Sequence, residues 1–407
     1  MPRVSVVIPT YNRAGLVQEA IDSVLAQLFQ DVELIVVDDG SEDDTASILQ
    51  ERYGSAIRLV VQENQGESGA RNRGIRESTG EYVAFLDSDD MWLPGKLSRQ
   101  IDVLDRWPDI GLISCQAYWM RDDGRRLKMK PQGHSTAAGS ISWRELAMGN
   151  CVAGGGSAAV ARSSVLEQVG IFDTSLNFGA DWDLWLRIAR NHRVYQIEEP
   201  LILYRINPQG TRTASPRTDD IHQLFERFYA IIDKALEQCP LGREECQKIG
   251  DLAQGHMLLR QAIMSLCVGH IDQGVRCWRQ VHEGSIFYIP HSAEVVDLIN
   301  SAVSGYAMLD WGLDGVSAAR RMVDQILAGL ASCTHEMRLD RDRVLGGVYA
   351  ELAHRSAANE DIRMARRYSL TAFRYQPRLI RNIGLAKILM TGGRHLWPDH
   401  AVHIAER

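Results

Sequence analysis

The sequence predicts an α/β fold in which a mainly parallel sheet has helices on both faces, followed by an all-α C-terminal part. Three observations lead to this prediction. Continuous apolar, β-branched runs in the first half are typical of strands buried on both faces of a parallel sheet. These runs alternate with segments whose apolar residues have helical spacing. From about residue 218 onward, helical patterns dominate.

Polar residues gather where the predicted strands end. We expect strands at residues 4–8, 32–37, 57–62 and 82–86, with helices at 15–28, 45–53 and 69–78 between them. Leu16, Ala20 and Ile21 show the helical spacing in the first of these helices. Polar clusters follow three of the strands, at residues 9–12, 38–41 and 87–90. Open parallel sheets bind ligands beyond the carboxyl ends of their strands, so we expect the functional site there.

The length of the chain and its second half predict two domains. The 407 residues, 45% of them hydrophobic, are enough for two or three domains with substantial cores. Helices are expected at 221–236, 250–267, 273–282, 293–308, 316–332, 341–356 and 361–375. Residues 207–216 are rich in Pro, Gly, Ser and Thr, so we divide the chain into domains 1–216 and 217–407. The spacing over residues 352–377 resembles one tetratricopeptide-type helix pair, although an ordinary helical bundle explains it equally well.

Charge is distributed unevenly along the chain. The 45 basic and 52 acidic residues give a formal net charge of −7, which argues against a general nucleic-acid binder. Residues 338–407 hold 13 basic and 7 acidic residues, a local net charge of +6, so the remainder carries −13. Basic residues alternate there with apolar ones. This pattern fits an anionic membrane or lipid-diphosphate-linked acceptor, a solvated helical face, or a homodimer or partner surface.

The sequence predicts a cytoplasmic protein, with peripheral contact at the inner face of the cell membrane as an option. No apolar run approaches the roughly 18 residues that cross a bilayer. The chain leads from Met1 directly into a strand-like run, without the pattern of a signal peptide. The seven cysteines are scattered and lack CxxC spacing, which predicts buried free thiols rather than a zinc site or disulfides.

An acidic motif, Asp87-Ser88-Asp89-Asp90, follows the fourth predicted strand. Carboxylates one residue apart at a strand end can reach a divalent cation and a ribose together. Their hard oxygens suit Mg²⁺ or Mn²⁺, which typically also bind substrate phosphates. By itself, such a motif fits a solvated turn or a helix cap equally well.

The acidic motif belongs to an ordered series. The series runs V-S-V-V-I-P-T-Y-N at 4–12, V-V-D-D-G-S at 36–41, N-Q-G at 64–66, A-R-N-R-G at 70–74 and G-E-Y-V-A-F-L-D-S-D-D at 80–90. In this order the motifs closely resemble those of the family 2 glycosyltransferases, which have the GT-A fold. The resemblance covers about residues 3–210.

The resemblance implies a nucleotide site at the strand ends. Pro9, Thr10 and Tyr11 would hold the base, to whose ring N–H Asp39 would offer a hydrogen-bond acceptor. Arg71 would approach the nucleotide, with a surface or helix-pairing role as its alternative. Asp38, beside Asp39, could fix the loop or serve only as a turn residue.

The resemblance also implies a metal site. Asp87 would bind ribose or metal, Ser88 would contact the nucleotide, and Asp89 would ligate Mn²⁺ or Mg²⁺. The cation would neutralise the pyrophosphate leaving group. Asp90 could instead cap a helical segment expected at 92–103.

A second cluster, at residues 170–187, is similar to the family segment that carries the catalytic base. An inverting transfer needs a carboxylate that takes the proton of the acceptor hydroxyl. Asp181 is our prediction for this role, and Asp183 is the second choice. A helix start favoured by the dipole is the alternative for Asp181. Ala180 stands where the family has Glu, which bears on contacts to the acceptor.

Further features flank this cluster. The turn Gly154-Gly155-Gly156 could let the backbone approach a sugar, or could be a plain flexible turn. Trp182 and Trp185 are expected in the core. Residues 203–207 resemble the family's Tyr-Arg-x-His stretch, which implies that Arg205 pairs with the diphosphate and that Asn207 replaces the His. The loop at 210–215 could close over the donor or be a linker.

Together these features imply an inverting, metal-dependent glycosyltransferase. It would move a sugar from a nucleotide-sugar, expected to be a UDP-sugar, to a glycan or lipid-linked acceptor in surface polysaccharide biosynthesis. The alternative is a noncatalytic sugar-nucleotide or glycan-binding scaffold with a helical interaction module. Ala180 and Asn207 suit that alternative, whereas the intact set of Asp residues and Arg71 argue against it.

Overall fold

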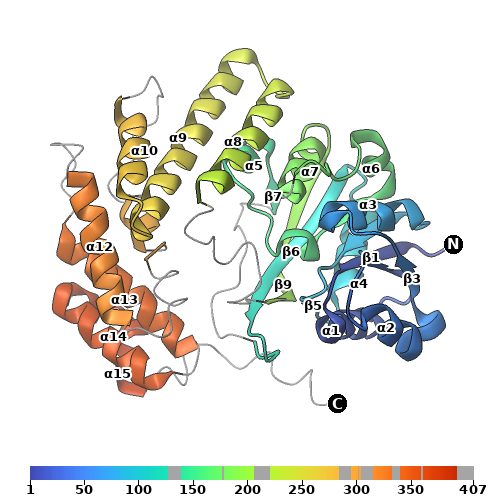
Figure 1. Cartoon of the computed structure of the whole chain (residues 1–407), viewed down its shortest axis with the longest axis horizontal. Coiled ribbons are helices and arrows are strands. Elements are labelled where there is room, and N and C mark those ends of the chain that lie inside the picture. Colours follow the sequence, from blue (N-terminus) through green and yellow to red (C-terminus); the bar gives the residue numbers. More distant parts are fainter. Residues whose placement is uncertain are drawn as a thin grey trace. The chain divides into compact units, whose positions relative to one another are not determined.

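The computed structural model describes residues 1–126, 139–176, 178–205, 221–283, 295–300, 302–303, 315–331, 340–358 and 361–391 (Figure 1). The chain forms two compact units, and each is described here by itself. The first comprises Met1–Arg126, Lys130–Ile206 and Glu226–Ala253, and the second comprises Leu127–Met129, Asn207–Phe225 and Gln254–Arg407. The predicted domain boundary after residue 216 lies outside the described residues and stays a prediction.

A mixed, mostly parallel sheet forms the centre of the first unit. Among the described residues its strands follow the order β3-β2-β1-β4-β8-β6-β9-β5, and β7 pairs with β9. The strands are β1 (Val4–Thr10), β2 (Val32–Asp38), β3 (Arg58–Val61), β4 (Tyr82–Phe85), β5 (Met91–Trp92), β6 (Ile110–Met120), β7 (Ser140–Ile141), β8 (Val160–Arg162) and β9 (Arg193–Arg205). The pairs β1–β2, β2–β3, β1–β4 and β6–β9 are parallel. This confirms the predicted fold class.

Helices cover both faces of the sheet because alternate strand residues point to opposite sides. On one face Val6 and Val36 pack against α1 (Ala14–Leu25), α2 (Thr45–Tyr53) and α4 (Lys96–Arg106). On the other face Ile35 and Val37 pack against Ala70 of α3 (Gly66–Glu77). The remaining helices of this part are α5 (Trp143–Met148), α6 (Ser163–Val169), α7 (Ala180–Ala189) and the 3₁₀ turns Gly54–Ala56 and Gly155–Ala158.

Several parts of this unit differ from the sequence-based expectation, and the long strand β6 is one element that it lacked. The helical segment expected at 92–103 begins later, since β5 comes first and α4 starts at Lys96 with Gly95 as its N-cap. A capping role for Asp90 is therefore wrong. The long strand β9 is absent from the expected elements, because its buried and exposed residues follow no regular alternation and form no continuous buried run.

The second half of the chain is helical throughout its described residues, as predicted. Its helices include α8 (Ile221–Glu237), α9 (Arg243–Cys267), α10 (Ile271–Glu283), α12 (Gly315–Ala331), α13 (Arg341–Ala358), α14 (Ile362–Tyr375), the 3₁₀ helix η4 (Pro377–Arg381) and α15 (Ile383–Thr391), and residues 295–300 and 302–303 are helical as well. Tyr349 of α13 stacks on Tyr368 and Tyr375, with ring centroids 6.3 and 5.7 Å apart. The tetratricopeptide-type interpretation of this helix pair stays a prediction. None of the described helices is long and apolar enough to span a bilayer.

The prediction of free thiols is wrong for two cysteines. Cys239 and Cys246 form a disulfide with a Cα–Cα distance of 6.2 Å. The turn between α8 and α9 folds the chain back, so residues seven positions apart meet without any CxxC spacing. Cys115, Cys267 and Cys277 are buried free thiols, as predicted, and Cys151 is a half-buried one.

Gly74 marks the closest approach of α3 to the sheet. A Cβ at this position would overlap Cγ1 of Val7 in β1. We expect Gly74→Ala to lower the free energy of unfolding by about 1–3 kcal/mol, since a packed core cannot absorb an extra methyl group without strain. Urea unfolding would measure this. Gly15→Ala in α1 is the matched control, because nothing lies within 4 Å of its Cβ and a gain of about 0.4–1 kcal/mol is expected. Equal effects of the two substitutions would contradict the packing argument.

Candidate active site

The carboxyl ends of β1 and β2 bring together the residues predicted to hold the base. Thr10 and Asp38 are register partners, and the Asp39 N–H donates to the Thr10 carbonyl over 2.9 Å. The Asp39 Oδ1 atom accepts hydrogen bonds from Gln62 Nε2 at 2.7 Å and from the Gln65 N–H at 2.9 Å. Asp39 is thus buried and held in one orientation at the strand ends.

Thr10 and Asp38 present further polar atoms at these strand ends. Asp38 Oδ1 accepts a hydrogen bond from the Ser41 N–H over 2.9 Å, a contact that fits both the loop-fixing and the turn role considered for this residue. Within the described residues, Thr10 Oγ1 and Asp38 Oδ2 are buried without a hydrogen-bond partner. Buried polar atoms rarely lack a hydrogen-bond partner, so these two oxygens mark a place where a bound ligand could supply one. Tyr11, the next residue, is 41% exposed.

Arg71 and Asp87 form the next part of the site. Arg71 lies on α3, and its Nη2 atom is 2.5 Å from Asp87 Oδ1 just beyond β4. Arg71 also pairs with Glu67 one helical turn earlier, and its guanidinium lies 5.3 Å from the Phe172 ring centroid. The surface alternative for Arg71 is wrong because the side chain is buried, whereas the helix-pairing alternative does occur.

The acidic motif forms a tight turn tied to its neighbours. The Asp87 N–H donates to Ser157 Oγ at 3.1 Å, and the Ser157 hydroxyl donates to Asp90 Oδ2 at 2.5 Å. Arg13 Nη1 lies 2.8 Å from Asp89 Oδ2 and 3.5 Å from Ser88 Oγ. Burial raises the pKa of Asp89, while the positive charge of Arg13 opposes this shift. Asp90 is buried and has a strongly raised pKa for the same reason, so it belongs to the support of the turn.

Arg205 is also part of this support. Its backbone N–H donates to Asp90 Oδ1 at 2.8 Å, and its Nε donates to the Asp89 carbonyl at 2.7 Å. Nη1 donates to the carbonyls of Arg121 and Asp122, and Nη2 lies 2.5 Å from Glu19 Oε2. These contacts favour a structural role, and pairing with a diphosphate stays a prediction. Asn207 and the 210–215 loop lie outside the described residues.

Asp181 lies in the first turn of α7, on the other side of the glycine turn. Asn150 Nδ2 donates to its Oδ2 atom over 3.1 Å. Burial raises the pKa of the Asp181 carboxyl above its ordinary value, although the positive charge of Arg71 opposes this shift. A Cβ on Gly155 would lie 3.5 Å from Asp181 Oδ2, and one on Gly156 would lie 3.1 Å from Arg71 Nη2 and 3.5 Å from Asp87 Oδ1. The two consecutive glycines therefore lie beside both halves of the site, the Arg71–Asp87 pair and Asp181.

The chain is similar to known glycosyltransferases. Residues 5–168 match the family described as Glycosyl transferase family 2. An uncharacterized glycosyltransferase of Rickettsia typhi is 35% identical over 251 residues, which cover 57% of this chain and 73% of the relative. The chain belongs to glycosyltransferase family 2.

Two further proteins are similar to this chain, one in sequence and one in fold. The GalNAc(5)-diNAcBac-PP-undecaprenol beta-1,3-glucosyltransferase of Campylobacter jejuni is 44% identical over 102 residues, 24% of this chain and 33% of the relative. The crystal structure of S. aureus TarS 1-349 in complex with UDP-GlcNAc has a TM-score of 0.51 at 17% identity, covering 89% of this chain and 91% of that one. The TarS comparison confirms the GT-A fold, and the family membership favours an enzyme over the scaffold alternative.

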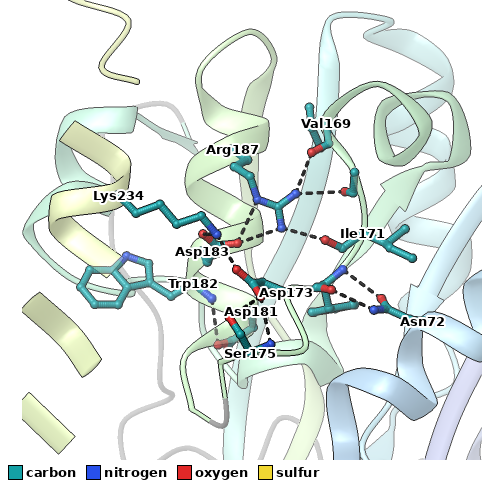
Figure 2. A network of polar contacts seen from close by, with 12 residues as sticks. Asn72, Val169, Ile171, Asp173, Ser175, Asp181, Trp182, Asp183, Arg187 and Lys234 are labelled. Carbon is teal, nitrogen blue, oxygen red and sulfur yellow. Dashed lines mark hydrogen bonds and ion pairs between the residues drawn. The ribbon is translucent and has the colours of Figure 1, made fainter. Parts of the chain in front are cut away.

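The helix that carries Asp181 is held by a charged network in this glycosyltransferase (Figure 2). Asp183 follows Asp181 by two residues on α7 and is buried. Its Oδ2 atom lies 2.9 Å from Arg187 Nε and 2.8 Å from Arg187 Nη2. Lys234 Nζ lies between Asp183 Oδ1, at 2.8 Å, and Asp173 Oδ2, at 2.7 Å. Arg187 also donates to the carbonyls of Val169, Gly170 and Ile171. These contacts lock α7 to the preceding loop.

The same loop connects the network to α3. Asn72 Nδ2 donates to the Phe172 carbonyl at 2.8 Å, and the Phe172 N–H donates back to Asn72 Oδ1 at 2.9 Å. Asn72 is the neighbour of Arg71, so one segment supports both the Arg71–Asp87 pair and the helix of Asp181. The two tryptophans of α7, Trp182 and Trp185, are buried in the core, as predicted.

The donor set of the acidic motif fits a divalent cation. Asp87 and Asp89 present carboxylate oxygens at a strand end, each beside an arginine. No group of three or more His, Cys, Asp or Glu in the described ranges could hold a metal by itself. Mg²⁺ and Mn²⁺ commonly bind through one or two carboxylates and take their remaining ligands from water and substrate phosphates. Asp87 and Asp89 are thus the residues that would hold such an ion together with substrate phosphates.

Sequence reasoning missed several residues of this site. Arg13, Ser157 and Asn150 contact the predicted residues from other parts of the chain, and Glu67 contacts Arg71 within α3. Glu67 stands four residues before Arg71, but the predicted helix begins only at residue 69, whereas α3 begins at Gly66 and so includes Glu67. The others are joined to their partners only by the tertiary fold.

Proposed function

We propose that this glycosyltransferase transfers a sugar from a nucleotide-sugar to a hydroxyl of a glycan or lipid-linked acceptor, with inversion and with a divalent cation. Surface polysaccharide biosynthesis is the setting we propose. The name of the Campylobacter relative, which describes sugar transfer to an undecaprenol-linked glycan, supports this acceptor class. We propose a UDP-sugar as donor, because such donors are common in the family that the motifs resemble.

The position of Gly155 and Gly156 beside both halves of the site carries the proposal. Gly156 lies against Arg71 and Asp87, and Gly155 lies against Asp181. A donor bound at the strand ends would place its diphosphate near Arg71 and Asp87, with its sugar toward the glycine turn. Because neither glycine has a side chain, a sugar ring could lie close to the backbone there.

In the proposed reaction, the acceptor oxygen attacks the anomeric carbon as Asp181 takes the proton of the hydroxyl. The bond between the anomeric carbon and the diphosphate oxygen breaks, and the nucleoside diphosphate leaves. Asp39, with Pro9, Thr10 and Tyr11, holds the base, Ser88 contacts the nucleotide, and Arg71 faces the phosphates. Asp87 and Asp89 would hold Mn²⁺ or Mg²⁺, which stabilises negative charge on the leaving group.

The test is nucleotide release from a panel of UDP-, GDP-, CDP- and dTDP-sugars by the full chain, with Mn²⁺ or Mg²⁺ and with chelator. We expect release of UDP that requires the cation and falls at least tenfold in Asp89→Asn, since one of two protein ligands is lost. Asp109→Asn is the matched control, because Asp109 is exposed and pairs with Arg193 at the surface. Turnover that is insensitive to chelator would refute the metal role, and release of another nucleotide alone would refute the UDP-sugar. Donor binding without turnover on any acceptor would instead favour the scaffold.

A further inference from the structure

Helix α14 in the second unit has one strongly basic face. Arg363, Arg366, Leu370 and Arg374 follow each other at spacings of three and four residues, so they share one stripe of the helix. All four are exposed. The opposite side, with Ala365, Tyr368, Ser369 and Ala372, is buried in the helical core.

The face continues beyond α14. Arg378 and Arg381 of η4 are exposed as well. Arg366 Nη2 donates to the Met390 carbonyl over 3.2 Å, which brings the end of α15 beside α14. Leu370 is 58% exposed and Met390 is 70% exposed. Two large apolar side chains thus stand among the arginines, and we call this surface the α14–α15 basic face.

All charged residues in the segment from α14 to α15 are basic. Residues 362–391 contain seven basic residues and no acidic one, in a chain whose net charge is −7. Elsewhere in the second unit arginines have acidic partners, as in Arg341 with Asp324 at 2.7 Å and Arg355 with Glu351 at 2.9 Å. A solvated face would be expected to carry such mixed charges. The basic face instead is complementary to an extended anionic surface.

We propose that the α14–α15 basic face docks this protein onto a bilayer that contains anionic phospholipids. The arginines would contact lipid phosphates through bidentate hydrogen bonds. Leu370 and Met390 would enter the boundary between headgroups and acyl chains, which a soluble polyanion does not offer. This apolar pair makes a membrane a better match than a free polyanion.

Vesicle flotation of the full chain tests the docking. One set of vesicles is phosphatidylcholine alone, and the other contains about one third phosphatidylglycerol. We expect binding only to the anionic vesicles, and weaker binding at higher salt because screening shortens the range of the attraction. Each basic residue near such a surface contributes about fivefold to partitioning, so Arg366→Gln with Arg374→Gln should lower it about 25-fold.

Two further sets of variants test whether vesicle binding depends on this face and on its apolar residues. Arg106→Gln with Arg125→Gln removes the same charge from exposed sites of the first unit, where side-chain exposures are 69% and 79%, and should leave flotation unchanged. Leu370→Ser should also weaken flotation without reducing binding to heparin beads. The proposal would be overturned if the protein did not float with anionic vesicles, or if both double variants lost flotation equally. It would also be overturned if Leu370→Ser left flotation unchanged. Thermal unfolding checks that each variant is folded, and none of these readouts depends on sugar transfer.

Discussion

Asp181→Asn is expected to lower the rate of sugar transfer by about 10²–10⁴-fold, the usual contribution of a positioned general base. The asparagine keeps the shape of the side chain and can still contact Asn150, but it cannot take a proton. The nucleotide-binding residues at the strand ends are unchanged, so the affinity for donor should stay within a few fold. Steady-state transfer rates and donor titration would separate these two effects. Asp109→Asn serves again as the control.

The pH dependence of transfer gives a second, independent readout of Asp181. A general base works only when it is ionised, and burial raises the pKa of this carboxyl. Activity should therefore be lost as the pH falls through a value above the roughly 4 of an ordinary Asp. Arg71 opposes the shift, so Arg71→Gln should move the acid limb of kcat/KM to still higher pH. An unchanged acid limb in both Asp181→Asn and Arg71→Gln would show that another group acts as the base.

Asp183→Asn is expected to lower the free energy of unfolding by about 1–3 kcal/mol, because it removes the charge of a buried carboxylate that two half-buried cations share. Asp183 is buried and binds both Arg187 and Lys234. Arg187 keeps its three carbonyl acceptors and Lys234 keeps Asp173, so the protein should still fold. Urea unfolding measures the change. Asp109→Asn breaks an exposed ion pair and should cost only about 0–1 kcal/mol.

A double variant tests the cause of this destabilisation. If the cost of Asp183→Asn comes from unpaired charge, adding Lys234→Met should recover part of it, as a double-mutant cycle would show. Purely additive losses would mean that packing, rather than charge, decides the stability of this network. Transfer activity should fall along with stability, since the same contacts hold the helix that presents Asp181.

Local patterns were enough for the fold class and for the strand ends. The predicted segments at 4–8, 32–37 and 82–86 appear as β1, β2 and β4, because short continuous apolar runs followed by polar clusters favour strands covered on both faces. Strand ends in a parallel sheet converge, so the positions of Thr10, Asp38 and Asp39 along the chain are sufficient to assign them to one edge. The roles in binding and catalysis assigned to them rest on the family resemblance and stay proposals.

Other features could not be read from spacing. Strand β9 has no simple periodicity, and the disulfide between Cys239 and Cys246 depends on the turn between two helices. Arg205 carries a motif that suggests a phosphate contact, yet in the fold its guanidinium meets Glu19, 186 positions away, and three carbonyls. Nothing in the neighbourhood of Arg205 along the chain predicts these partners.

The sequence alone therefore determined the sheet with its covering helices, the helical second half and the motifs of family 2, since each depends on residues close together in the chain. Only the tertiary structure decided which charges meet: Arg13 with Asp89, Lys234 with Asp183, and Arg71 with Asp87 beside the glycine turn. Hydrophobic periodicity specifies which face of an element is buried. It does not specify which polar groups on distant elements are brought within a few ångströms when those faces pack.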